Sequence, residues 1–214
     1  FVIVLVADAS WISFDGFKNI IAHFLFVHNF FPSYHGAING ALWTMGVTFQ
    51  FYLIAPLMYL MFKRYGGEKV EFACVLFTVL AKYFVFSWGF SHMELGEEYS
   101  IIIGRQLITV IDNFSTGMYV AYLIHDKHLQ VTKRKAISII LFSVILIVTV
   151  CRIGQRYGIY TDNISGFIWH SMLALAISGG LLGVSYLELK VKGVIYKILI
   201  WLACYEYEIY IWHL

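Results

Sequence analysis

Residues 136–151 read AISIILFSVILIVTVC, a run with no charged side chain, preceded by Lys133-Arg134-Lys135 and followed by Arg152. As a helix this run is roughly 24 Å long. A bilayer core about 30 Å thick needs about 20 mostly apolar residues to cross it. The long basic side chains at both ends can extend to the interfaces and cover the shortfall. The run therefore predicts the shortest of several membrane-spanning helices.

Further apolar runs of spanning length lie on both sides of this one. They cover residues 42–62, 70–88, 106–124, 167–187 and 194–214, and residues 1–7 are typical of the end of one more span. The chain has no fixed-period repeat, low-complexity tract or long linker. We therefore expect an all-α polytopic transmembrane helix bundle, with about six full spans and a partial N-terminal one. Residues 1–214 are expected to form a single membrane-embedded domain, truncated at both ends.

The composition of the chain agrees with this interpretation. Of its 214 residues, 60% are hydrophobic and 13% charged, against about 45–50% and about 25% in soluble proteins. A net charge of +2 without a basic stripe argues against nucleic-acid binding. The three histidines at positions 23, 28 and 35 do not have the spacing of a metal-binding motif, so no metal is expected. Membrane lipid is the expected surrounding.

Basic residues in the short loops predict the orientation of the spans. The loops at 63–69, 125–135 and 188–193 carry nine Lys and Arg residues, whereas the loop at 89–104 carries only glutamates among its charged residues and the loop at 152–166 carries two arginines. Cytoplasmic loops are the ones enriched in Lys and Arg. The first three loops are therefore predicted to be cytoplasmic. Between the first two spans, residues 18–31 (KNIIAHFLFVHNFF) are too short to span and predict an interfacial or re-entrant helix stopped by Pro32.

Several ionisable residues lie well inside the predicted spans, where a charge is costly and usually marks function or a specific pair. They are Lys82, Asp112, Glu206 and Glu208. With the predicted orientation all four lie at a similar depth in the outer half of the bilayer, together with Gln50 and His170. A shared depth predicts a polar cavity open to the extracytoplasmic side. The alternative is that Lys82 only pairs with a carboxylate to hold helices together.

Some of these positions also share helix faces. Glu206, Tyr210 and His213 are spaced i, i+4, i+7, and Trp43 and Gln50 are seven residues apart.

Four stretches resemble the acyltransferase 3 family of membrane proteins. Residues 42–56 (LWTMGVTFQFYLIAP) are similar to the family signature "LWSLSVEEQFYLLWP", and residues 26–31 (FVHNFF) to the "flhNff" that precedes it. Residues 112–118 (DNFSTGM) resemble "D-x-F-x-x-G-m", and residues 207–213 (YEIYIWH) resemble "YSIYLWH". The stretches occur in the order found in the family.

The sequence departs from the family at specific positions. Thr48 occupies the position of the first signature glutamate, and Phe49 follows it. Glu206 and Glu208 occupy the positions of two serines. The catalytic histidine of the family, and the arginines that follow it, would lie upstream of Phe1.

The resemblance implies a membrane O-acyltransferase that moves an acyl group, acetyl foremost, from cytoplasmic acyl-CoA (acetyl-CoA) to a hydroxyl of an extracytoplasmic polysaccharide or other glycan. It implies a multi-pass protein of the cell membrane, the bacterial inner membrane foremost. Acyl transfer needs a base for the hydroxyl and donors for the oxyanion. The predicted catalytic residues are Asp112, Gln50, Tyr52 and His213. The predicted substrate-binding residues are Trp43, Lys82, Glu206 and Tyr210.

Two other functions remain open from the sequence. Buried lysine and carboxylates at one depth also suit a secondary transporter or flippase for a polar solute or lipid-linked sugar. Thr48 at the glutamate position would suit a family member that has lost its activity.

Overall fold

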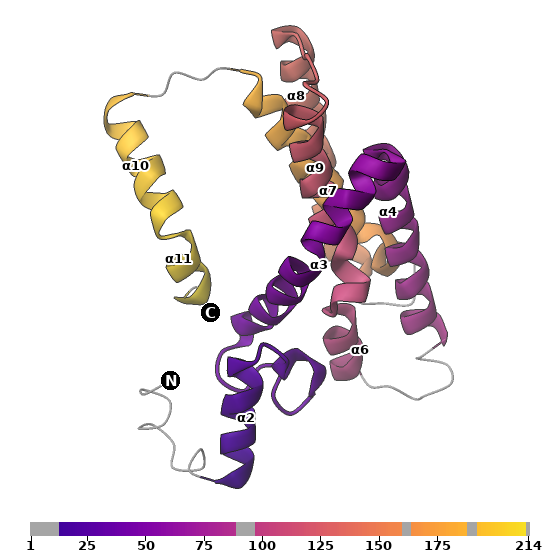
Figure 1. Ribbon diagram of the computed structural model, residues 1–214, viewed down its shortest axis with the longest axis vertical. Coiled ribbons are helices and arrows are strands. Elements are labelled where there is room, and N and C mark those ends of the chain that lie inside the picture. The colour runs from indigo at the N-terminus through magenta and orange to yellow at the C-terminus, as the bar shows by residue number, and fades with distance from the viewer. Residues whose placement is uncertain (1–12, 89–96, 160–163, 188–191, 213–214) are drawn as a thin grey trace. The chain divides into compact units, whose positions relative to one another are not determined.

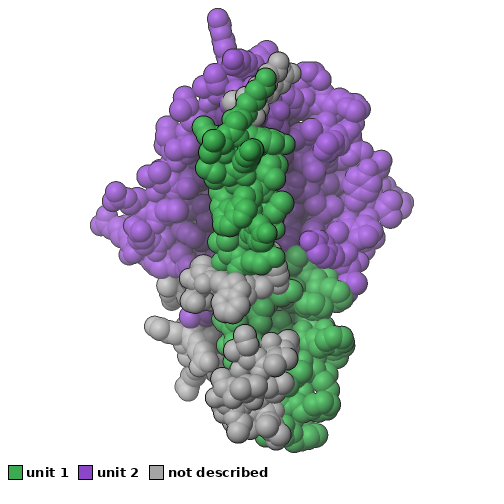
Figure 2. All heavy atoms as spheres, turned by 90° about the vertical axis from the view of Figure 1, so that its left-hand side faces the viewer, with its two compact units in different colours: residues 1–50, 189–214 green, residues 51–188 purple. Residues whose placement is uncertain are grey.

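A computed structural model describes residues 13–88, 97–159, 164–187 and 192–212 of the chain (Figure 1). Every regular element in these ranges is a helix, which confirms the predicted all-α class. The chain packs as two compact units, residues 1–50 with 189–214 (unit 1) and residues 51–188 (unit 2), coloured separately in Figure 2. The partial span predicted at residues 1–7, and residues 213–214 of the last predicted span, lie outside the described residues.

Among the described residues, five helical segments are long and apolar enough to cross a membrane. They are Gly40–Tyr65, Gly67–Ser87, Ile101–His125, Lys133–Tyr157 and Ile164–Ser185. They correspond to five of the six full spans predicted from apolar runs. The protein is therefore a multi-pass helical bundle, as the sequence indicates.

Each of these segments contains one main helix. These helices are α3 (Trp43–Tyr65), α4 (Gly67–Tyr83), α7 (Leu107–His125), α8 (Lys133–Tyr157) and α9 (Ile164–Ser185). A π-helix, η4 (Phe84–Trp88), continues α4, and α6 (Glu97–Gly104) precedes α7.

Helix α8 is longer than the apolar run that predicted it. It begins at Lys133 because the Thr132 side chain accepts a hydrogen bond from the Lys135 backbone N–H, and such a cap satisfies a donor that the first turn leaves free. It ends at Tyr157, beyond Arg152. With 25 residues it needs no help from extended side chains to reach spanning length.

The sixth predicted span, 194–214, is interrupted. Helix α10 (Gly193–Cys204) ends at Tyr205, whose φ of −110° and ψ of 12° are not helical, and α11 (Glu206–Trp212) follows. Glu206 and Glu208 lie in the first turn of α11, where the positive end of the helix dipole favours carboxylates. Among the described residues this region is therefore two short helices rather than one long span.

Unit 2 is held together by close helix contacts. Helices α8 and α9 form its most extensive pair, and α7 packs against both α4 and α9. At Gly154 in α8 the indole of Trp169 in α9 lies where a side chain would begin, and its Nε1–H donates to the Val150 carbonyl at 2.8 Å. At the start of α4, Gly67 leaves room for the rings of Tyr119 and Tyr122 on α7.

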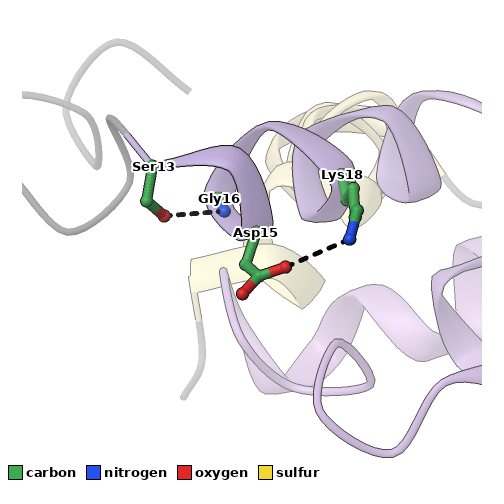
Figure 3. Close-up of polar contacts among 4 residues, drawn as sticks. All are labelled: Ser13, Asp15, Gly16 and Lys18. Atoms are coloured by element: carbon green, nitrogen blue, oxygen red, sulfur yellow. Dashed lines mark hydrogen bonds and ion pairs between the residues drawn. The ribbon is translucent and has the colours of Figure 1, made fainter.

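Unit 1 contains the first described helix, α2 (Phe14–Phe24). The Ser13 hydroxyl oxygen accepts a hydrogen bond from the Gly16 backbone N–H at 3.0 Å, and Lys18 Nζ lies 3.3 Å from Asp15 Oδ1 (Figure 3). Both contacts are favourable in the first turns of a helix. They explain why the helix begins before residue 18.

The predicted extent of this helix, 18–31, is wrong at both ends. The helix stops at Phe24, where Val27 N–H donates to the Ala22 carbonyl and Phe26 N–H donates to the His23 carbonyl. Phe26 has a φ of 57°. This is the Schellman arrangement, which usually places glycine at the left-handed position. A short 3₁₀ helix, η2 (His28–Phe30), follows, and Pro32 does not end α2.

Candidate functional site

The interior of unit 2 contains two charged residues with no exposed surface, Lys82 on α4 and Asp112 on α7. Both were predicted as site residues, and the structure brings them together. Lys82 is the cation whose charge acts on the Asp112 carboxyl. A charged side chain this deep in a membrane-spanning bundle is costly and is usually retained for a role.

Hydroxyl groups surround the Asp112 carboxyl. The Asn113 backbone N–H donates to Asp112 Oδ1 at 3.0 Å, and the side chains of Thr78 and Ser171 face the carboxyl. Neither Asp112 Oδ2 nor Lys82 Nζ has a hydrogen-bond partner among the described residues. A buried polar atom that lacks a partner costs free energy in the folded state. This arrangement therefore leaves one acceptor and one cationic donor available at the same place.

A second carboxylate extends this polar interior along α4. The Ser115 hydroxyl donates to Glu71 Oε2 at 2.7 Å, and the Thr116 hydroxyl lies 2.6 Å from Oε1. Both hydroxyls also lie within hydrogen-bond distance of the Asp112 backbone carbonyl. Glu71 is 7% exposed. The α7 segment that follows Asp112 is therefore hydrogen-bonded to α4 through Glu71.

A cavity of about 250 Å³ borders this cluster. It is lined by Asn113, His170, Leu173, Ala174, Ile177 and Ser178. His170 also interacts electrostatically with Lys82 and Arg105. The lining of the cavity thus combines amide, imidazole and hydroxyl groups with apolar side chains, which is the usual make-up of a small-molecule site.

In unit 1, the stretches that resemble the acyltransferase 3 family touch each other. Gln50 Nε2 donates to Asn29 Oδ1 at 3.0 Å, which joins residues 42–56 to residues 26–31. Gly46 lies against Asn29, and a Cβ there would be 2.8 Å from Asn29 Oδ1. The glycine is therefore required for this close approach.

The third family-like stretch of unit 1 reaches the same helix. Tyr210 donates to the Ala41 carbonyl at 3.2 Å, and its hydroxyl oxygen lies 3.0 Å from the Thr44 hydroxyl. Asn29 and Tyr210 therefore contact the first turns of α3 and the residues just before it.

Of the remaining predicted site residues, Trp43 adjoins these contacts, because its backbone N–H donates to the Ala41 carbonyl. The Trp43 ring stacks with His35 at a centroid distance of 6.4 Å. Tyr52 is 66% exposed, and Glu206 is exposed. His213 lies outside the described residues. The convergence of the whole predicted set on one cavity stays a prediction.

Several residues of the polar interior were not predicted. Glu71 and Thr78 are two of them. They lie eleven and four residues before the predicted site residue Lys82, so all three share one face of α4. The sequence analysis singles out neither Glu71 nor Ser171, and it does not include Arg105 among the candidate residues.

No family model, curated protein or solved structure matches this chain.

Proposed function

We propose that this chain is a multi-pass membrane O-acyltransferase that moves an acyl group from acyl-CoA to a hydroxyl of an extracytoplasmic glycan. The observation that carries the proposal is the placement of Asp112. It belongs to a family-like stretch, it is fully buried beside Lys82, and the next residue, Asn113, lines a cavity. The contacts among the three family-like stretches of unit 1 give further support.

The chemistry requires a base, an oxyanion partner and a place for the acceptor. The acceptor oxygen attacks the thioester carbonyl carbon, its proton passes to the base, and the CoA thiolate leaves. Lys82 is suited to donate to the oxyanion, because its ammonium has no partner among the described residues. Asp112 is suited to orient the histidine base that the resemblance to the acyltransferase 3 family implies. The cavity beside His170 and Ser178 would hold the acceptor.

The donor would approach from the other side of the membrane. The loops predicted to be cytoplasmic are rich in Lys and Arg, and a basic surface attracts the anionic phosphates of CoA. No metal takes part in this scheme.

Transfer of radiolabelled acetyl from acetyl-CoA tests the proposal. Membranes that contain the full-length protein and a glycan acceptor are expected to accumulate label in an alkali-labile ester on the glycan. Membranes without the protein, with equal acceptor, give the background. Label at background level across acceptor glycans, with the protein present and folded, would refute the proposal.

A second candidate function is proton-coupled transport of a polar solute or lipid-linked sugar. It is favoured by the series Glu71, Thr78 and Lys82, which extends over roughly 16 Å of α4 at 1.5 Å per residue and contacts the hydroxyls and carboxyl of α7. Such chains of buried ionisable groups occur in proton relays. Uptake into proteoliposomes that follows a pH gradient, without ester formation, would favour this function over acyl transfer.

A further inference from the structure

Unit 1 contains a pocket that the acyl-transfer proposal does not use. It encloses about 300 Å³ and is lined by His23, Phe24, Phe26, His28, Leu42 and Met45. This volume is at the low end of small-molecule sites. Four of the six lining side chains are apolar, and the two polar ones are histidines.

The two histidines are stacked and buried. Their ring centroids are 4.0 Å apart with an angle of 7° between the planes, and His23 and His28 are 6% and 1% exposed. His23 Nδ1 lies 3.0 Å from the Asn19 carbonyl, and His28 Nε2 lies 3.0 Å from the Leu42 carbonyl. A carbonyl can only accept a hydrogen bond, so each of these nitrogens carries a proton.

The opposite nitrogens are then acceptors. Burial, opposed by the Asn19 carbonyl and aided to a smaller extent by the nearby His28, lowers the pKa of His23 to about 4. Burial also lowers the pKa of His28. Both rings are therefore neutral near pH 7, and a neutral ring with one N–H has a lone pair on its other nitrogen.

One of these acceptors is the better candidate for a ligand. Neither His23 Nε2 nor His28 Nδ1 has a hydrogen-bond partner among the described residues. The Ala22 carbonyl also faces the His28 ring. His23 Nε2 is therefore the buried acceptor that most needs a donor, because a buried polar atom without a partner is costly.

We propose that this pocket binds a small apolar molecule with a hydroxyl group, whose O–H donates a hydrogen bond to His23 Nε2. A hydrocarbon would leave the nitrogen without a donor. A carboxylate would bring a second acceptor to a pocket whose lining, in the described chain, has no cationic side chain. Phe24 lines the pocket and is 79% exposed, so an amphipathic alcohol can enter from the apolar surface of α2. This inference does not depend on acyl transfer.

Cyclohexanol and methylcyclohexane test the proposal as a matched pair, because they differ by a hydroxyl in place of a methyl group. The full-length protein is labelled with ¹⁵N-histidine and ¹³C-methyl methionine and reconstituted in lipid nanodiscs. The Met45 methyl signal reports occupancy of the pocket by either molecule, and the ring ¹⁵N signals report the hydrogen bond.

We expect cyclohexanol to shift one unprotonated histidine nitrogen in a saturable way. After correction for partition into lipid, its Kd should be roughly fivefold to tenfold lower than that of methylcyclohexane, as one hydrogen bond implies. Equal affinity of the two molecules, or no saturable shift of any ring nitrogen, would overturn the proposal.

Substitutions assign the effect to His23. His23→Phe keeps an aromatic ring in the stack but removes the acceptor, so the preference for cyclohexanol should disappear. His125→Phe, at an exposed histidine of α7, should leave the preference unchanged. If His23→Phe does not fold, Leu42→Trp should fill the pocket and abolish saturable binding of both molecules. Persistence of binding in Leu42→Trp would contradict the assignment.

Discussion

Lys82 and Asp112 face each other from neighbouring helices α4 and α7, both fully buried, yet they do not approach to ion-pair distance and Lys82 Nζ has no partner among the described residues. A pair kept only to join two helices would be expected to close. The separation of Lys82 and Asp112 suits a site where a reacting group binds between the cation and the carboxyl.

Substitution of Lys82 or Asp112 alone should lower the free energy of unfolding. Substitution of both should lower it by less than the sum of the two single effects. Lys82→Met leaves a buried carboxyl without its cation, and Asp112→Asn leaves a buried ammonium without its anion. Each is expected to lower the free energy of unfolding by about 3–5 kcal/mol. The double variant should recover part of this loss in an SDS unfolding titration.

The matched control for this cycle is Lys69→Met, because Lys69 lies on the same helix with an exposed side chain. It should change stability little. Strict additivity of the two single substitutions would mean that Lys82 and Asp112 are not coupled.

The hydroxyls that bind Glu71 should stabilise unit 2. Ser115→Ala and Thr116→Val each remove a hydrogen bond to a buried carboxyl, with an expected cost of about 1–3 kcal/mol. Thr149→Val provides the control, because this exposed hydroxyl bonds only within its own helix. Thermal unfolding in detergent measures the three variants. Equal effects for all three would show that the contacts with Glu71 add nothing.

The contact of α8 with α9 depends on Gly154. Gly154→Ala places a methyl group against the indole of Trp169, and such overpacking costs about 1–3 kcal/mol. Gly117→Ala is the matched control, because a Cβ at Gly117 meets nothing within 4 Å. There, alanine should stabilise the helix by up to about 1 kcal/mol. The two changes should therefore shift the unfolding midpoint in opposite directions. If both shifted it in the same direction, the close contact of Trp169 with Gly154 would not be the cause.

Acid should loosen the end of α2. Burial lowers the pKa of His23 to about 4 in the folded protein, whereas the unfolded value is about 6.5. Between these values the unfolded state binds more protons, so stability is full above about pH 6.5 and is lost as the pH falls toward 4. Protection of the α2 amides in hydrogen exchange, corrected for intrinsic rates, should fall by about 2 kcal/mol between pH 7 and 5.

The His23→Phe variant should lose this pH dependence, whereas His125→Phe should keep it. An unchanged pH dependence in His23→Phe would assign the effect to another group.

The sequence predicted most of the bundle, because apolar length alone marks a span. It did not predict the interruption at Tyr205, since a local change of φ and ψ leaves the apolar character of residues 194–214 unaltered. It also missed the end of α2, because Phe26 occupies a left-handed position usually taken by glycine.

Charge was the sequence signal for the two predicted site residues that the structure places near each other. Lys82 and Asp112 were conspicuous inside apolar runs, and they lie together. Thr78 and Ser171 did not stand out in the sequence, because hydroxyl side chains are common in membrane helices. Only the packing shows which of these hydroxyls face a carboxyl. Glu71 lies about one turn after the start of α4. A charged residue near a helix end is usually exposed, and the sequence does not show that this one is buried.

The most direct test of the proposed function compares the same substitution at two aspartates. Asp112→Asn and Asp126→Asn are introduced into the full-length protein, and labelled acetyl transfer from acetyl-CoA to glycan is measured at equal protein levels. Asp126 lies outside the spans, where it binds Tyr59 and Lys63. We predict that Asp112→Asn lowers the rate by about 100-fold or more and that Asp126→Asn retains the wild-type rate. Wild-type transfer in Asp112→Asn would contradict the account.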